Sequence, residues 1–125
     1  MRTGAVIPDT SFLVQLAEPG GRLAMDKITE ILGWPTPRFV VPSCVLAELR
    51  ALSRNKPEAG LALEFARGLE VIDRDGPPDA AVLDAAEELA GIVATMDGVM
   101  LREARRRGIP TLTLHGGIPV LAGDP

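Results

Sequence analysis

Four acidic residues spread along the chain, Asp9, Glu48, Asp79 and Asp97, have the types and positions to carry metal-dependent chemistry. Asp9 and Asp97 each follow a short apolar run that predicts a buried strand, and open α/β sheets present functional groups at the carboxyl ends of their strands. Glu48 and Asp79 lie on predicted helices, at spacings that place them on or beside the buried face. Each of the four has a plainer role as an alternative, helix capping above all. Convergence at one edge of a sheet is the stronger account of all four.

Carboxylates held close together repel one another and raise each other's pKa, so such a cluster is tolerable chiefly when divalent ions share the charge. A set of oxygen ligands without thiolate or imidazole selects Mg²⁺ or Mn²⁺. Two such ions about 4 Å apart can activate water and stabilise the leaving oxygen of a phosphoryl displacement. The four acids therefore predict a metal-dependent enzyme that hydrolyses phosphodiester bonds.

The composition excludes several other classes of protein. The formal net charge is −4, from 13 basic and 17 acidic residues, so the chain is not a polycation that holds nucleic acid by phosphate contacts alone. Cys44 and His115 are the only cysteine and histidine, too few for a structural zinc site. No apolar run approaches the roughly 20 residues needed to cross a bilayer. We therefore expect a soluble, cytoplasmic protein without a membrane partner.

Short apolar runs alternate with helical patterns along the chain. Strands are predicted at 5–7, 39–41, 69–72, 92–95 and 111–114, and helical periodicity or capping residues mark the segments between them. The runs are apolar throughout, which is typical of parallel strands covered on both faces. The prediction is one domain over residues 1–125, a three-layer α/β/α fold with a central, mainly parallel five-stranded sheet. Residues 115–125 are expected to form an irregular tail.

Several short motifs together resemble the PIN-domain ribonucleases. They are Val6-Ile7-Pro8-Asp9-Thr10-Ser11, Ala47-Glu48-Leu49, Asp79-Ala80-Ala81-Val82, Ile92-Val93-Ala94-Thr95-Met96-Asp97 and Arg107-Gly108-Ile109-Pro110. The likeness runs from about residue 5 to residue 114 and includes the order and spacing of all four acids. Within the family, the chain looks most similar to the small stand-alone members related to ribosomal-RNA processing endonucleases, and less similar to toxin members.

The resemblance implies a PIN-like fold and a ribonuclease whose four acids, Asp9, Glu48, Asp79 and Asp97, coordinate Mg²⁺ or Mn²⁺. It further implies that Thr10 or Ser11, together with Thr95, orients the carboxylates by hydrogen bonds. RNA is the implied substrate, and a homodimer, an antitoxin or a ribosome-assembly partner are the implied protein contacts. The apolar second helix, with Ile28, Ile31 and Trp34, could form a dimer surface or belong to the core.

Two positions depart from the family pattern. Pro8 stands where a β-branched residue is usual, and Met96 replaces the common asparagine before the last acid. Methionine cannot donate a hydrogen bond to a neighbouring carboxylate, so the order of the site or its metal affinity would suffer.

Contacts to RNA phosphates require cations, and Arg50, Arg54 and Lys56, which follow Glu48, are the predicted RNA-binding residues. The arginines between positions 102 and 107 are alternatives, although they also fit a solvated face near a helix carboxyl end. Trp34 is the only aromatic residue expected to be available for stacking on a base.

Together, the residues and the resemblance predict a metal-dependent endoribonuclease that acts in rRNA processing or as a toxin-type ribonuclease. The alternative is a weakly active or inactive PIN-like module for RNA binding or assembly. A phosphatase or phosphate-receiver domain is disfavoured, because the segment after the first strand holds a single acid.

Overall fold

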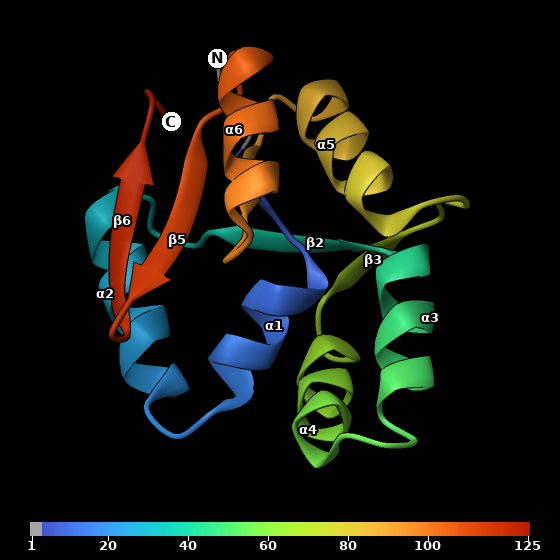
Figure 1. Cartoon of the computed structure of the whole chain (residues 1–125). Coiled ribbons are helices and arrows are strands. Elements are labelled where there is room, and N and C mark those ends of the chain that lie inside the picture. The colour runs from blue at the N-terminus through green and yellow to red at the C-terminus, as the bar shows by residue number, and fades with distance from the viewer. Residues whose placement is uncertain (1–3) are drawn as a thin grey trace.

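The computed structural model describes residues 4–125, and residues 1–3 of the predicted domain lie outside that range. Its strands are β1 (Ala5–Pro8), β2 (Arg38–Pro42), β3 (Glu70–Ile72), β4 (Ile92–Ala94), β5 (Thr111–His115) and β6 (Ile118–Ala122). Its helices are α1 (Thr10–Ala17), α2 (Gly21–Leu32), α3 (Ser43–Leu52), α4 (Pro57–Ala66), α5 (Pro78–Glu88) and α6 (Gly98–Arg106). The three-layer α/β/α fold with a mainly parallel sheet is confirmed (Figure 1).

The strands form one sheet in the order β3-β2-β1-β4-β5-β6, and β1 to β5 run parallel. The chain builds outward from β1 to β3, then returns to place β4 on the other side of β1. The order of the strands therefore reverses between β1 and β4. A crevice opens at such a switch point, outside the carboxyl ends of the two strands.

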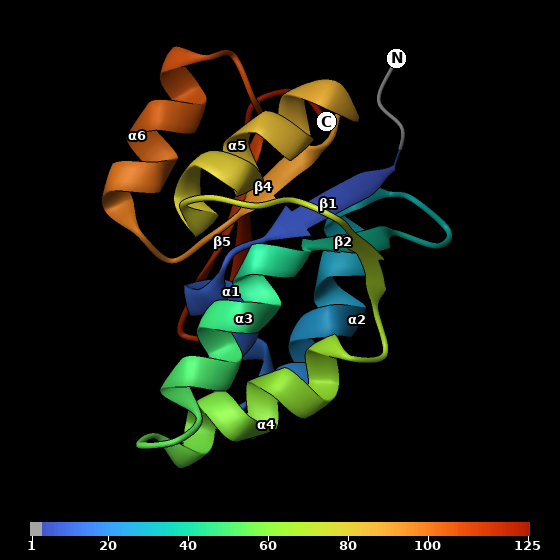
Figure 2. The same cartoon turned by 90° about the vertical axis from the view of Figure 1, so that its right-hand side faces the viewer.

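The reversal also divides the helices between the two faces of the sheet. Helices α1 to α4 lie on one face and α5 and α6 on the other, as right-handed crossovers require (Figure 2). Successive side chains of β1 point to opposite faces of the sheet and belong to two core clusters. Ile7 is in the cluster of Val82 and Met100, whereas Val6 is in the cluster of Phe12 and Ile28. The sheet is thus buried on both faces at its centre, which fixes the carboxyl ends of β1 and β4.

The expected irregular tail is wrong, because β6 pairs antiparallel with β5 and makes the sheet six-stranded. Gly116 and Gly117 form the turn, with φ values of 58° and 79°. A two-residue hairpin of the type I′ geometry needs positive φ at both central positions, which glycine adopts without strain. Pro119 is tolerated because β6 is an edge strand.

The opposite edge strand, β3, is more exposed than its apolar sequence suggested. Glu70 and Val71 face solvent, because β3 has a neighbour on one side only. Arg38 donates two hydrogen bonds to Glu70, at 3.2 and 2.7 Å, and so ties β3 to β2.

The second helix contributes mainly to the core. Ile28 is fully buried and Trp34 is half-buried, whereas Ile31 is partly open to solvent. Ile28 therefore cannot belong to a dimer surface. No helix within residues 4–125 is both long and apolar enough to cross a membrane.

Candidate metal centre

Asp9 and Asp97 follow the carboxyl ends of the neighbouring strands β1 and β4, each at the start of a helix. The Asp9 carboxylate accepts a hydrogen bond from the Phe12 backbone N–H at 2.9 Å and caps α1. Asp97 caps α6 in the same way, through the Val99 N–H at 2.9 Å. Capping is therefore a real role for both residues. It occupies one oxygen of Asp97, and within residues 4–125 the other oxygen accepts no hydrogen bond.

Two hydroxyl groups hold the Asp9 carboxylate in a single orientation. Ser11 Oγ donates to Asp9 Oδ1 at 2.7 Å, and Thr95 Oγ1 donates to Asp9 Oδ2. Both hydroxyls are themselves fixed, because the Met96 N–H donates to Ser11 Oγ at 2.9 Å and the Asp97 N–H donates to Thr95 Oγ1 at 3.0 Å. With the Phe12 N–H, three of about four acceptor positions on Asp9 are filled. One position stays open for a further ligand.

Asp9 is a buried carboxylate, only 5% exposed, and no Lys or Arg in the described part of the chain forms an ion pair with it. Burial raises the pKa of Asp9, and the charge of Asp79 raises it slightly more. The hydrogen bonds from Thr95, Ser11 and the Phe12 N–H oppose that shift. The ionised form is thus held at a cost that a nearby cation would relieve.

Asp79 links the four acids electrostatically. It is the second residue of α5, where Pro77 holds the capping position, so the N-cap alternative for Asp79 is wrong. Partial burial raises its pKa most, followed by the negative charges of Asp97 and Glu48. Because Asp79 also acts on Asp9, it lies within electrostatic reach of each of the other three acids.

Glu48 reaches this group from α3. The buried side of α3 is formed by Val45 and Leu49, and Glu48 lies beside it with its side chain open to solvent. Of the two placements expected for Glu48, on the buried face or beside it, the structure shows the second. Thr10 Oγ1 donates a hydrogen bond to Glu48 Oε1, so the residue directly after Asp9 links α1 to α3.

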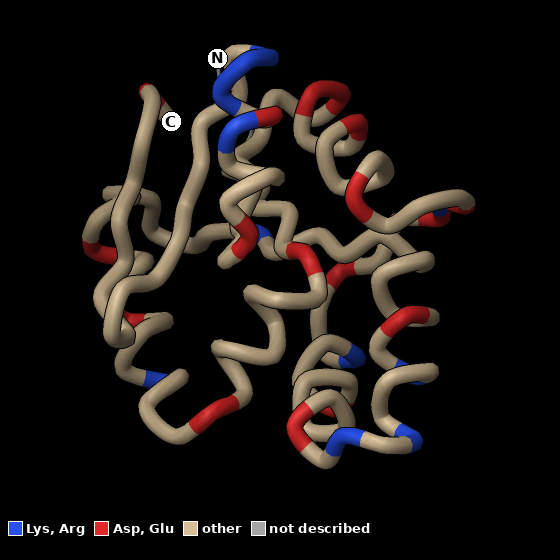
Figure 3. Tube along the Cα trace, in the orientation of Figure 1, with Lys and Arg blue, Asp and Glu red and all other residues tan. Residues whose placement is uncertain are grey.

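The donor set suits a hard divalent cation, although the side chains do not close around one point. Among residues 4–125, no three Asp, Glu, His or Cys side chains come close enough together to hold one ion. Asp9 and Asp97 keep open acceptor positions, and the exposed side chains of Glu48 and Asp79 can rotate toward them. In Figure 3, red acidic segments mark the starts of α1 and α6 and lie on α3 and α5. The residues therefore fit Mg²⁺ or Mn²⁺ by chemistry and by placement at one edge.

The predicted RNA-binding cations lie along α3 and beyond its end. Arg50, Arg54 and Lys56 are all exposed. Arg50 is the second residue after Glu48 on α3, and Arg54 and Lys56 follow the end of that helix. They could contact only a strand that extends from the acidic cluster along α3. Trp34 precedes β2 and so lies at the amino ends of the parallel strands, whereas the acids lie toward their carboxyl ends. It therefore cannot provide a surface on which a base stacks beside the acids.

The structure accommodates both departures from the family pattern, Met96 and Pro8, through contacts with neighbouring strands. The side chain of Met96 is half-buried in the core, and the Thr113 hydroxyl contacts its sulfur at 3.7 Å. It therefore faces β5 and not the Asp9 carboxylate. Pro8 is the last residue of β1, and the Asp9 N–H that follows donates to the Ala94 carbonyl at 2.9 Å, so the pairing with β4 continues.

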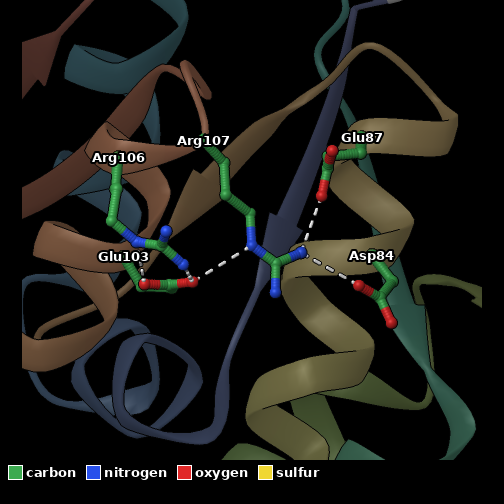
Figure 4. Close-up of polar contacts among 5 residues, drawn as sticks. All are labelled: Asp84, Glu87, Glu103, Arg106 and Arg107. Atoms are coloured by element: carbon green, nitrogen blue, oxygen red, sulfur yellow. Dashed lines mark hydrogen bonds and ion pairs between the residues drawn. The ribbon is translucent and has the colours of Figure 1, made fainter.

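An ion network that the sequence pattern did not indicate joins α5 and α6, the helices at whose starts Asp79 and Asp97 lie. Arg107 Nη1 contacts Asp84 at 3.0 Å and Glu87 at 2.6 Å on α5, while its Nε contacts Glu103 at 3.3 Å on α6 (Figure 4). Arg106 also binds Glu103, whose pKa falls to about 2 through this pair and through Arg107. Arg106 and Arg107 at the end of α6 are thus paired with carboxylates, whereas Arg105 is exposed.

Solved structures with the same arrangement include the PIN domain endonuclease Utp24, which superposes with a TM-score of 0.75 over 94% of this chain and 90% of that chain, at 21% identity. The chain folds as a PIN domain. A domain of a functionally unknown protein from Methanocaldococcus jannaschii matches this chain with a TM-score of 0.64, at 19% identity, over 89% of this chain and 91% of that one.

A curated relative of this chain is Ribonuclease VapC9 from Archaeoglobus fulgidus, which is 32% identical over 78 residues. The match covers 58% of this chain and 58% of that protein, so the chain spans little more than half of its relative's length. No family model matches the chain. The structural and sequence comparisons together confirm the resemblance to PIN-domain ribonucleases.

Proposed function

We propose that this PIN domain is a metal-dependent endoribonuclease that cuts RNA at the carboxyl edge of its sheet. The observation that carries the proposal is Asp9, a buried carboxylate at the strand-order switch point, fixed by three donors and without an ion-pair partner among residues 4–125. A polar group kept in that state at a cost to stability points to a functional role.

Asp9 and Asp97 would hold Mg²⁺ or Mn²⁺ from the two sides of the crevice, and Glu48 and Asp79 would complete the ligand set from α3 and α5. When bound, such an ion supplies positive charge that activates water and stabilises a phosphoryl group during in-line displacement. Hydrolysis adds one water across the bond: its oxygen joins the phosphorus, and the departing ribose oxygen takes up a proton.

The surrounding hydroxyls prepare the carboxylates for that role. Ser11 and Thr95 orient Asp9, and Thr10 orients Glu48. Residues that fix ligands in this way preserve the geometry of a metal site between turnovers. Because the donors belong to α1 and to the end of β4, the site rests on rigid elements and not on loops.

The names of two similar proteins, a ribonuclease and a PIN domain endonuclease, support RNA as the substrate and internal cleavage as the reaction. A role in rRNA processing or as a toxin-type ribonuclease, and contacts with a second copy, an antitoxin or a ribosome-assembly partner, remain predictions of the sequence. Arg50, Arg54 and Lys56 remain the predicted contacts for a strand that runs along α3.

The proposal is tested by cleavage of a single-stranded RNA labelled with a fluorophore and a quencher, with and without Mn²⁺. The wild-type chain should cleave only with Mn²⁺, and both Asp9→Asn and Asp97→Asn should lower the rate at least about 100-fold. Asp26→Asn, an exposed change on α2, is the matched control and should keep full activity. Circular dichroism should show that all three variants are folded.

Full cleavage in EDTA, or by both site variants, would overturn the proposal. Calorimetric titration with Mn²⁺ separates the alternative function. A chain that binds RNA but neither cleaves it nor binds Mn²⁺ saturably would be a PIN-like binding or assembly module.

A further inference from the structure

A groove of about 470 Å³ runs between α5 and α6, directly beside the acidic cluster. Its lining includes one of the four acids, an apolar floor and arginines from α6: Asp79, Leu83, Val99, Met100, Arg102 and Arg106. The volume lies in the range of pockets that bind small organic ligands. Because Asp79 forms one end, anything bound in the groove would adjoin the proposed metal site.

The floor of the groove is apolar and partly open. Leu83 and Met100 are buried beneath it, whereas Val99 is 63% exposed. Val99 is the second residue of α6, two positions after Asp97. An exposed aliphatic side chain at this position offers the face of a base a surface to pack against, next to the carboxylates.

The cations along the groove differ in their availability. Arg106 and Arg107 are bound to carboxylates, but Arg102 forms no hydrogen bond or ion pair within residues 4–125. The Arg102 Nη1 atom lies only 3.5 Å from the position that a Cβ on Gly98 would occupy. Its guanidinium is therefore folded back along α6 toward Asp97, as helical side chains lean toward the helix amino terminus.

We propose that this groove binds the nucleotide next to the phosphate that is cut, in a single-stranded RNA. Arg102 pairs with a backbone phosphate, and the base packs on Val99. The choice of RNA as the ligand rests on charge complementarity. Arg102, which has no ion-pair partner among residues 4–125, lies one helical turn after Gly98, the neighbour of Asp97, so a polyanion could contact both Arg102 and the proposed metal site. The inference rests on the proposed function, and it adds a path for the strand along α6.

The groove carries no side-chain amide or hydroxyl to read the edge of a base, and its Arg106, Arg107 and Glu103 are already paired with one another. Packing on an aliphatic or aromatic surface tolerates every base, because each base has an apolar face. Binding at this subsite should therefore vary by less than about fivefold among RNA homopolymers.

The test measures fluorescence anisotropy of a labelled single-stranded RNA of about 12 nucleotides, bound to the full chain with Asp9→Asn and Mn²⁺ present. Adding Arg102→Ala should weaken binding about tenfold and lower the slope of log Kd against log salt by about 0.7. Arg105→Ala is the matched control, because Arg105 lines a separate cavity with Pro110 and Asp124 and should change binding much less.

A second variant gives a gain that misfolding cannot imitate. Val99→Trp places an aromatic ring on the floor and should tighten binding about fivefold or more without changing the salt slope. Leu61→Trp, at a similarly exposed position on α4, should leave the affinity unchanged. In the cleavage assay, Arg102→Ala should raise KM with little change in kcat.

The two proposals fail in different ways. If the wild-type chain neither binds nor cleaves RNA, the proposed function and the groove are both overturned. If it cleaves RNA while Arg102→Ala matches Arg105→Ala and Val99→Trp matches Leu61→Trp, only the groove is overturned.

Discussion

The Thr95 hydroxyl donates a hydrogen bond to the Asp9 carboxylate across 86 positions of the sequence. The same oxygen accepts the Asp97 N–H at 3.0 Å, so one threonine fixes both acids of the crevice. Its side chain is fully buried, which leaves no room for water to replace it.

Thr95→Val should therefore weaken Mn²⁺ binding about tenfold or more, because the isosteric change removes the donor that orients Asp9. The pKa of Asp9 should rise further, since the lost hydrogen bond lowers it. Unfolding should become easier by about 1–3 kcal/mol, because buried polar groups lose their partner. Thr95→Ser keeps the hydroxyl and is the control. Equal Mn²⁺ affinity of the valine and serine variants in calorimetry would refute the positioning role.

Asp9→Asn should make the metal-free protein more stable at neutral pH. Burial raises the folded-state pKa of Asp9 above its ordinary value of 3.8, so the folded state holds its proton to higher pH than the unfolded state. The stability that this difference gives is present at low pH and is lost as the pH rises through the folded pKa. Asparagine retains the cap on α1 without the buried charge.

Thermal unfolding in EDTA, from about pH 4 to about pH 8, checks this expectation. The gain in Tm of Asp9→Asn over the wild type should grow with pH. Asp79→Asn should behave in the same direction, because the pKa of Asp79 is raised too. A difference in Tm that does not depend on pH would contradict the assignment of a buried charge.

Arg107→Lys should lower Tm by a few degrees, because an ammonium group cannot reproduce the fork that contacts Asp84, Glu87 and Glu103. The loss should shrink in about 1 M salt, which screens exposed ion pairs. Arg67→Lys is the control, since Arg67, the C-cap of α4, pairs within residues 4–125 only with Glu64 of that helix. If the two variants melt together, the network contributes no special stability.

Gly117→Ala and Gly60→Ala should change stability in opposite directions. Gly117 has φ 79° in the β5–β6 turn, where alanine should cost about 1 kcal/mol. Gly60 is inside α4, and a Cβ there would meet only the Ser53 Cβ at 3.9 Å, so alanine should stabilise by about 0.5–1 kcal/mol. Urea titrations of both variants measure the two effects. A stable Gly117→Ala variant would mean that the turn does not hold β6 in place.

Most of the fold could be predicted from the sequence, because the patterns that mark its strands and helices are local. Apolar runs followed by capping residues predicted the β1–α1 and β2–α3 transitions, and β1 to β5 follow the predicted order. β6 was missed because its signal is a Gly-Gly turn followed by Ile118, Pro119 and Val120, which is weak in hydrophobic pattern and contains a proline. Which strands are neighbours could not be read from local pattern, since the order depends on long-range pairing.

The same distinction between local pattern and long-range pairing applies to the site. Placement of Asp9 and Asp97 after strands came from local pattern, but the shared switch point required the strand order. The exposure of Glu48 could not be foreseen, because helical spacing gives a direction and not the position of α1 across from it. Likewise, the bonds from Arg107 to α5 join residues 20 and 23 positions apart and leave no mark in a helical wheel.

Because β4 lies late in the chain but pairs with β1, the sheet and the site are completed late in synthesis. β1 meets β2 early in the chain, but its other edge stays unpaired until residues 92–94 insert beside it. Only then do Thr95 and Asp97 reach Asp9. A nascent chain on the ribosome, surrounded by RNA, therefore carries an incomplete acidic centre until its last third has emerged.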